Sequence, residues 1–97
     1  MQVKVELFDL LRVIAGQKYV VLQINEPTLA PLLEELVHCY GSRFREQMYN
    51  PRNGKLLPSV LFFLNGKSLG NGLTPDVLST PLHDGDSVSI LHILSGG

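Results

Sequence analysis

Hydrophobic and polar residues alternate at the start of the chain, over residues 2–9. One side of this segment is aliphatic, and the other carries Lys4, Glu6 and Phe8. Alternation with a period of two is typical of a half-buried strand. A second segment, rich in β-branched and aromatic residues, covers residues 18–24, and a connection at residues 11–16 separates the two. The pattern therefore predicts two strands that pair as a hairpin.

The hydrophobic period becomes helical after Thr28, a candidate N-cap. Apolar residues then recur three and four positions apart, at Leu29, Leu32, Leu33, Leu36, Val37 and Tyr40. Gly41 follows and is well suited to end a helix. Burying each large side chain is worth roughly 1.5–3 kcal/mol, so we expect this helix to pack on the sheet. Cys39, near the edge of the apolar stripe, is expected to be a small buried residue rather than a nucleophile.

The second half of the chain alternates between polar stretches and short apolar ones. Residues 42–57 are polar and predict a long loop with at most a helical turn. A central strand is predicted at residues 58–64, and Asn65-Gly66 then predicts a tight hairpin into a short strand at residues 67–69. Asp84-Gly85-Asp86 predicts a turn before the last strand, at residues 87–93. If the first and last strands are parallel neighbours, the sheet is mixed, and the helix covers one face of it.

These elements predict one α+β domain over residues 1–97, with a C-terminal tail at residues 94–97. Eight basic and nine acidic residues give a formal charge of −1, which argues against nucleic-acid binding. One cysteine excludes a disulfide framework and fits a reducing compartment. No apolar run is long enough to span a bilayer, and charges interrupt the N-terminus where a signal peptide would be apolar. We therefore expect a cytoplasmic protein without a membrane partner.

Familiar catalytic and ligand-binding motifs are absent or incomplete. Gly66-Lys67-Ser68 imitates the end of a P-loop, but Leu61 occupies the position of its first glycine. Asp84-Gly85-Asp86 lacks the other ligands of a calcium loop. The three histidines, His38, His83 and His92, have no metal-ligand spacing. We therefore expect no metal, no bound cofactor and no catalytic residue.

Half of the basic residues lie within thirteen positions: Arg43, Arg45, Arg52 and Lys55. Two interpretations stay open for this segment. It is either a solvated loop or a surface for an acidic partner or an anionic ligand, and the solvated loop is the more common outcome for such a pattern.

The C-terminal sequence Leu94-Ser95-Gly96-Gly97 follows directly on the last predicted strand. Gly96 and Gly97 have no Cβ and fit a channel too narrow for other side chains. The terminal carboxylate has a pKa of roughly 3.3–3.7 and is ionised at neutral pH. ATP can activate it as an acyl-adenylate, which a sulfur donor can convert to a thiocarboxylate. The alternative is a simple frayed end.

Five short motifs, in this order, resemble those of the ubiquitin-like β-grasp sulfur carriers. This family includes the molybdopterin synthase small subunit, the thiamine-biosynthesis sulfur carrier and the ubiquitin-related modifier. The matching segments are Leu7-Phe8 through Leu11-Arg12 to Gly16 ("LR…G"), Thr28 with Leu32 and Leu33 ("TV..LL..L"), Leu64-Asn65-Gly66 ("VNG"), residues 82–88 ("L.DGD.V") and Gly96-Gly97. The resemblance covers nearly the whole chain and implies a β-grasp fold.

The resemblance also implies a carrier without catalysis of its own. An E1-like adenylyltransferase would use ATP to adenylate Gly97, and a sulfurtransferase would supply sulfur. The tail formed by Ser95, Gly96 and Gly97 would then thread into an acceptor enzyme such as the molybdopterin synthase large subunit and deliver the thiocarboxylate there. The family's docking positions match Phe8, Arg12 and Leu91, and strand parity adds Phe63 and Ile93 on the uncovered sheet face.

The chain departs from the usual sequences of the family in two places, so the resemblance supports the class of protein better than any one pathway. Molybdopterin-type carriers usually end in "PPVAGG", whereas this chain ends in Ile93-Leu94-Ser95-Gly96-Gly97. Thiamine-type carriers usually lack the loop at residues 42–57. The molybdopterin pathway is the first expectation, and tRNA thiolation, thiamine synthesis or another sulfur metabolite are alternatives. Two further hypotheses are a ubiquitin-like modifier conjugated to lysines through Gly97 and a passive adaptor in which the two glycines are incidental.

Overall fold

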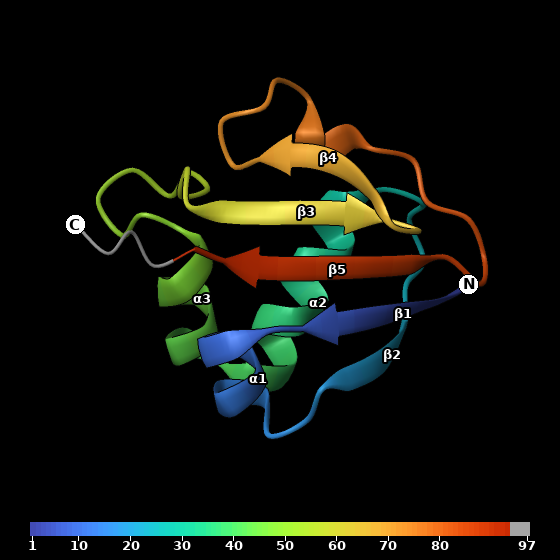
Figure 1. Cartoon of the computed structure of the whole chain (residues 1–97), viewed down its shortest axis with the longest axis horizontal. Coiled ribbons are helices and arrows are strands. Elements are labelled where there is room, and N and C mark those ends of the chain that lie inside the picture. Colours follow the sequence, from blue (N-terminus) through green and yellow to red (C-terminus); the bar gives the residue numbers. More distant parts are fainter. Residues whose placement is uncertain (94–97) are drawn as a thin grey trace.

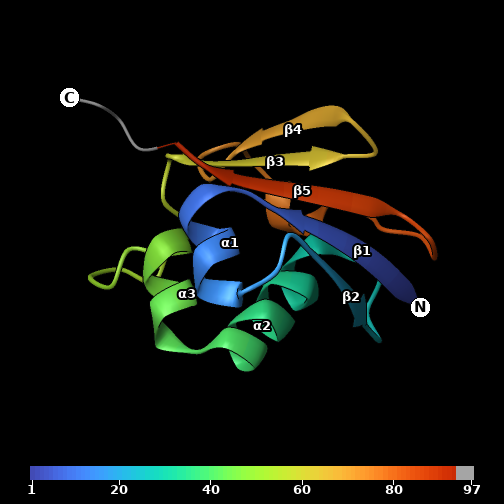
Figure 2. The same cartoon turned by 60° about the horizontal axis from the view of Figure 1, so that its bottom comes forward.

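The computed structural model describes residues 1–93, which form a five-stranded sheet with the helices packed on one face (Figures 1 and 2). The elements in chain order are β1 (Gln2–Leu7), α1 (Asp9–Ala15), β2 (Tyr19–Gln23), α2 (Leu29–Tyr40), α3 (Ser42–Met48), β3 (Val60–Leu64), β4 (Lys67–Asn71), the 3₁₀ turn η1 (Val77–Ser79) and β5 (Ser87–His92). No helix within residues 1–93 is both long and apolar enough to cross a bilayer.

The strand order across the sheet is β2-β1-β5-β3-β4. The first and last strands are parallel neighbours, with Val5 opposite Val88, and the other pairs are antiparallel. Figure 1 shows β5 in the middle of the sheet, between β1 and β3. The predicted α+β class and the mixed sheet are therefore confirmed.

The core lies between the sheet and the helices. One side of each central strand is fully buried, and α2 contributes Leu29, Leu32, Leu33 and Leu36. The sheet contributes Val3, Val5, Leu7, Val60, Phe62, Val88 and Ile90. Helix α2 begins directly after Thr28 and ends where the Gly41 amide donates to the Val37 carbonyl at 2.7 Å, as the sequence predicts. The side chains that face the helices thus hold the sheet in place, and the opposite face stays uncovered (Figure 2).

The connection predicted at residues 11–16 is wrong, because residues 9–15 form helix α1. Leu11 is fully buried and anchors this short helix to the core. Gly16 ends it in the left-handed conformation, with its amide donating to the Arg12 carbonyl at 2.8 Å. A helix of two turns with one buried residue is too short to show a repeating period, which explains the error.

The long loop predicted at residues 42–57 is also wrong in its first half, where α3 forms. Phe44 and Met48 lie four positions apart on one face of α3, and both are fully buried. The loop after α3 is itself tied back, since the Leu57 amide donates to the Met48 carbonyl at 2.7 Å. Strand β4 extends two residues beyond the predicted 67–69, to Asn71.

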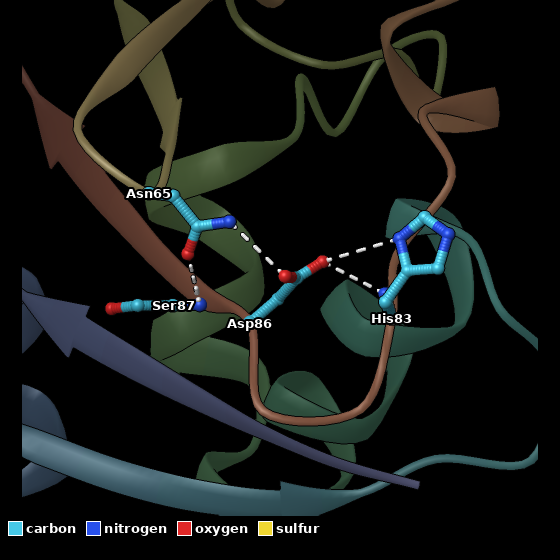
Figure 3. Close-up of polar contacts among 4 residues, drawn as sticks. All are labelled: Asn65, His83, Asp86 and Ser87. Atoms are coloured by element: carbon cyan, nitrogen blue, oxygen red, sulfur yellow. Dashed lines mark hydrogen bonds and ion pairs between the residues drawn. The ribbon is translucent and has the colours of Figure 1, made fainter.

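Two turns meet at one end of β5 and fasten it (Figure 3). The β3–β4 hairpin has positive φ at both Asn65 and Gly66, as a type I′ turn requires. The Asn65 side chain donates to Asp86 at 3.0 Å and accepts from the Ser87 amide at 2.9 Å. Asp86 also accepts from the His83 amide at 2.7 Å. We call this the turn end of the sheet, and the opposite end, where β5 ends at His92 and the chain continues to Ile93, the tail end.

Candidate functional site

The uncovered face of β5 changes from polar to apolar toward the tail end. Ser87 and Ser89 are followed on the same face by Leu91 and Ile93, because side chains alternate along a strand. Strand β3 places Leu61 opposite Leu91, and Phe63 opposite Ser89. These side chains are half-buried, except for Ile93, which is 50% exposed. The apolar part of this face therefore lies beside the point where the chain leaves the sheet.

Three of the predicted interface residues, Phe63, Leu91 and Ile93, thus share one face of adjacent strands. Of the remaining two, Phe8 immediately precedes α1 and Arg12 lies in its last turn. The parallel register pairs Leu7 with Ile90, so the extended residue Phe8 lies next to Leu91 along the same edge. We call Phe8, Leu91 and Ile93, together with Leu61, which the interface prediction omitted, the apolar tail-end patch. Phe63, opposite Ser89, lies on the same face but closer to the turn end.

Arg12 borders this patch with a fixed side chain. Its Nε atom donates to the Leu7 carbonyl at 3.2 Å, which caps the end of β1. Its guanidinium carbon lies 5.9 Å from the centre of the Phe8 ring, within the range of a cation–π contact. Because one guanidinium nitrogen is used and others stay available, Arg12 can still donate to an acceptor on a partner.

Ser59, which the sequence analysis did not identify, contacts His92 and Ile93 at the tail end of the sheet. Its carbonyl accepts from the Ile93 amide at 2.8 Å, and its hydroxyl lies 3.1 Å from His92 Nε2. The other ring nitrogen of His92, Nδ1, is buried and has no hydrogen-bond partner within residues 1–93. Ser59 and His92 are 33 positions apart, so no local sequence signal connects them. The predicted threading residues Ser95, Gly96 and Gly97 lie outside the described residues.

Cys39 has an environment that does not favour a nucleophilic thiolate. Cys39 is exposed, which corrects the expectation that it is buried. Partial desolvation, and then the Glu35 carboxylate 3.7 Å from its Sγ atom, raise the pKa of the Cys39 thiol. A raised pKa leaves less of the reactive thiolate at neutral pH. Within residues 1–93, no cluster of three or more His, Cys, Asp or Glu side chains could hold a metal ion.

Asp84-Gly85-Asp86, which the sequence analysis rejected as a calcium loop, forms a turn. The Asp86 amide donates to the His83 carbonyl at 3.0 Å, and Gly85 has a φ of +87°, which favours glycine. The Asp84 carboxylate accepts from the Gln2 amide at 2.7 Å and so ties this turn to β1. Lys67 and Ser68 begin strand β4 and do not form a phosphate-binding loop.

Comparisons with known proteins place this geometry in context. No family model and no curated protein matches the sequence. Solved structures match along nearly the whole chain. SAMP1 from Haloferax volcanii, a small archaeal modifier protein, has a TM-score of 0.82 and 20% identity, and the match covers 100% of both chains.

Two further solved structures that match the chain are named as other proteins. A putative molybdopterin converting factor subunit 1 from Pyrococcus furiosus has a TM-score of 0.71 and 21% identity, over 97% of this chain and 99% of that one. CysO from Mycobacterium tuberculosis has a TM-score of 0.72 and 29% identity, over 95% and 99%. The chain therefore has the ubiquitin-like β-grasp fold, and the resemblance to the β-grasp sulfur carriers inferred from its motifs is confirmed by its structural neighbours.

Proposed function

We propose that this chain is a sulfur carrier whose Gly97 carboxylate is converted to a thiocarboxylate by partner enzymes. The observation that carries the proposal is the apolar tail-end patch beside the point where the chain leaves β5. Four residues follow Ile93, and a fully extended chain of this length reaches at most about 14 Å. An enzyme that covers the patch therefore has the C-terminal carboxylate within reach of its active site.

The chemistry requires two steps on that carboxylate. An E1-like adenylyltransferase binds ATP, and a Gly97 oxygen attacks the α-phosphorus, which releases pyrophosphate and leaves an acyl-adenylate. Hydrosulfide supplied by a sulfurtransferase then attacks the acyl carbon, the bond to AMP breaks, and the thiocarboxylate remains. The carrier supplies a small, unbranched acyl end, since Gly96 and Gly97 have no side chains to obstruct a narrow channel. Catalytic groups and ATP belong to the partners.

Docking is assigned to Phe8, Arg12, Phe63, Leu91 and Ile93. Apolar side chains at the centre of an interface exclude water, and a peripheral arginine adds directed hydrogen bonds. The first acceptor we propose is a molybdopterin synthase large subunit, which is supported by the name of the Pyrococcus furiosus structure. Carriers for tRNA thiolation, thiamine or another metabolite would use the same tail and patch.

Intact mass spectrometry tests this function. The protein is incubated with ATP, sulfide and its activating enzyme, and matched samples omit either ATP or sulfide. The expected result is a mass gain equal to the exchange of one oxygen for sulfur, located on Gly97 and present only in the complete mixture. A Gly97 carboxylate that never acquires sulfur under these conditions contradicts the proposal.

A ubiquitin-like modifier is the second candidate, favoured by the fold match over all of SAMP1. In this function a lysine amine of a target protein attacks the acyl carbon of the Gly97 adenylate, forms an isopeptide bond and releases AMP and a proton. Adducts in a cell lysate that survive denaturation, and disappear when Gly97 is deleted, would support conjugation. If no such adducts form while Gly97 does become a thiocarboxylate, the modifier function is excluded and the sulfur-carrier function remains.

A further inference from the structure

The charges of the chain are unevenly distributed. Residues 42–57 contain four basic residues and one acidic residue, whereas the rest of the chain contains four basic and eight acidic ones. We call residues 42–57 the basic segment. Three of the acidic residues outside this segment, Glu26, Glu34 and Glu35, line a hollow beside α2. A nearly neutral chain thus carries one surface with a clear positive excess.

The basic segment consists of a helix and a loop that hydrogen bonds hold in place. Its first half is α3, and Tyr49 and Leu56 form a β-bridge across the following turn. Asn50 accepts from the Arg52 amide, and Asn53 accepts from the Lys55 amide, each at 2.9 Å. These side-chain bonds to backbone amides fix the turn that presents Arg52 and Lys55. Ordering in advance reduces the entropy that a partner must remove on binding.

The basic side chains of the segment are free of ion pairs in the described part of the chain. None of its four basic side chains forms an ion pair within residues 1–93, and all four residues are exposed. The Arg45 guanidinium instead lies over the Tyr49 ring, 5.4 Å from its centre. Both residues line a hollow of about 310 Å³ between α3 and the turn, which Glu46 also borders. The segment therefore offers positive charge together with a recess for a side chain.

The basic segment lies at the tail end of the sheet. Figures 1 and 2 both show α3 and the loop that follows it at the end where β5 finishes. The covalent path agrees, because Ser59, two residues after the segment, pairs with Ile93 through its carbonyl. A protein that engages the C-terminal residues must approach this end, so it meets the basic segment as well as the apolar tail-end patch.

We infer that the basic segment is a second docking surface, which takes an acidic patch on the enzyme that acts on the tail. The inference rests on the proposed function only for its choice of partner. Opposite charges accelerate association and orient two proteins before the apolar contact forms. Exposed charges are screened over about 10 Å at 0.1 M salt, so this contribution falls as the ionic strength rises. Arg43 and Arg52 supply charge, and Arg45 with Tyr49 supplies the recess.

A titration of the isotope-labelled protein with a peptide of eight glutamates tests the surface independently of Gly97. NMR shift changes are expected at residues 42–57 and are expected to disappear at high salt. A peptide of eight lysines serves as the control ligand. Truncation before Gly96 should leave the titration unchanged, so a failure of the tail chemistry and a failure of the docking surface give different results.

The matched variants are Arg52→Glu and Lys67→Glu, which make the same charge change at exposed positions. Lys67 lies in the hairpin at the turn end. We expect Arg52→Glu to weaken peptide binding about fivefold at low salt and Lys67→Glu to change it less than about twofold. Equal effects of the two variants, shift changes spread over the whole chain, or tighter binding of a single-stranded oligonucleotide of the same charge would overturn the inference.

Discussion

The two ends of β5 differ in the contacts that their side chains make. At the turn end, hydrogen bonds within the chain satisfy Asn65 and Asp86, and two separate turns become one unit. At the tail end, Leu91 and Ile93 continue an apolar face that nothing in residues 1–93 covers. Groups already bonded within the chain have little left to offer a partner, whereas uncovered apolar side chains gain free energy when a partner buries them. The turn end therefore stabilises the fold, and the tail end is available for function.

Removing Gly96 and Gly97 is expected to have the largest effect, because it should abolish function at the tail end without changing the stability of the fold. The truncated protein should lose all ability to acquire sulfur, because the carboxylate that becomes activated no longer lies at the end of an unobstructed segment. Its thermal midpoint should stay the same, since residues 1–93 form the core on their own side-chain contacts. Parallel measurements of intact mass and thermal unfolding check both parts. Full function of the truncated protein with its partner would instead favour the passive adaptor.

Asp86→Ala is expected to give the largest loss of stability among the surface changes considered. Its carboxylate accepts from Asn65 and from the His83 amide, and loss of such bonds to a charged acceptor at a partly exposed site costs about 1–2 kcal/mol. Urea unfolding gives this value. The control is Glu34→Ala, which removes the same charge from an exposed position on α2 and should change stability by less than about 0.5 kcal/mol. Equal losses in the two variants would mean that the network at the turn end does not matter.

Acid should weaken the turn end selectively. The hydrogen bond from Asn65, and then the one from the His83 amide, hold the pKa of Asp86 below its ordinary value of 3.8. A carboxyl group whose pKa is lowered by folding stabilises the protein above its unfolded-state pKa, and this stabilisation is lost as the pH falls through its folded-state pKa. The difference in thermal midpoint between the native protein and Asp86→Asn should therefore be constant at neutral pH and shrink below about pH 4. A difference that does not depend on pH would contradict the lowered pKa.

Cys39→Ser is expected to have the smallest effect. The thiol is exposed, and its raised pKa leaves it largely protonated at neutral pH. Both the unfolding free energy, within about 0.5 kcal/mol, and the sulfur transfer should be unchanged. Sulfur transfer that stops in this variant would show that the thiol takes part, and catalysis would then no longer belong entirely to the partners.

Local patterns in the sequence predicted the regular elements well. The six apolar positions between Leu29 and Tyr40 indicate α2, and Asn65-Gly66 indicates the hairpin, because each signal lies within a few residues. Helices α1 and α3 each have only seven residues and bury one or two of them, so their period cannot be read from the sequence. Cys39 was misjudged because it lies at the edge of the α2 stripe, where the protein does not cover it.

Contacts between distant residues were beyond local patterns. Asn65 and Asp86 are 21 positions apart, and each was predicted only as part of its own turn. Phe63 and Ile93 were assigned to the uncovered face because strand parity fixes which side chains share a face, whereas Leu91 was assigned from the family resemblance. That Leu61 lies beside Leu91 was not predicted, since it requires the register between β3 and β5. The role of the basic residues was left open for the same reason, as the order of residues 49–57 depends on tertiary contacts.

A comparison of Ile93→Asp with Val21→Asp tests the central claim most directly. Both are β-branched residues on the uncovered sheet face, 50% and 60% exposed, so neither change should unfold the protein. Val21 lies on the edge strand β2, away from the apolar tail-end patch. With the activating enzyme, Ile93→Asp should raise the KM at least about tenfold with a similar kcat, while Val21→Asp should leave the KM within about twofold. Equal KM values for the two variants would contradict a docking site at the tail end.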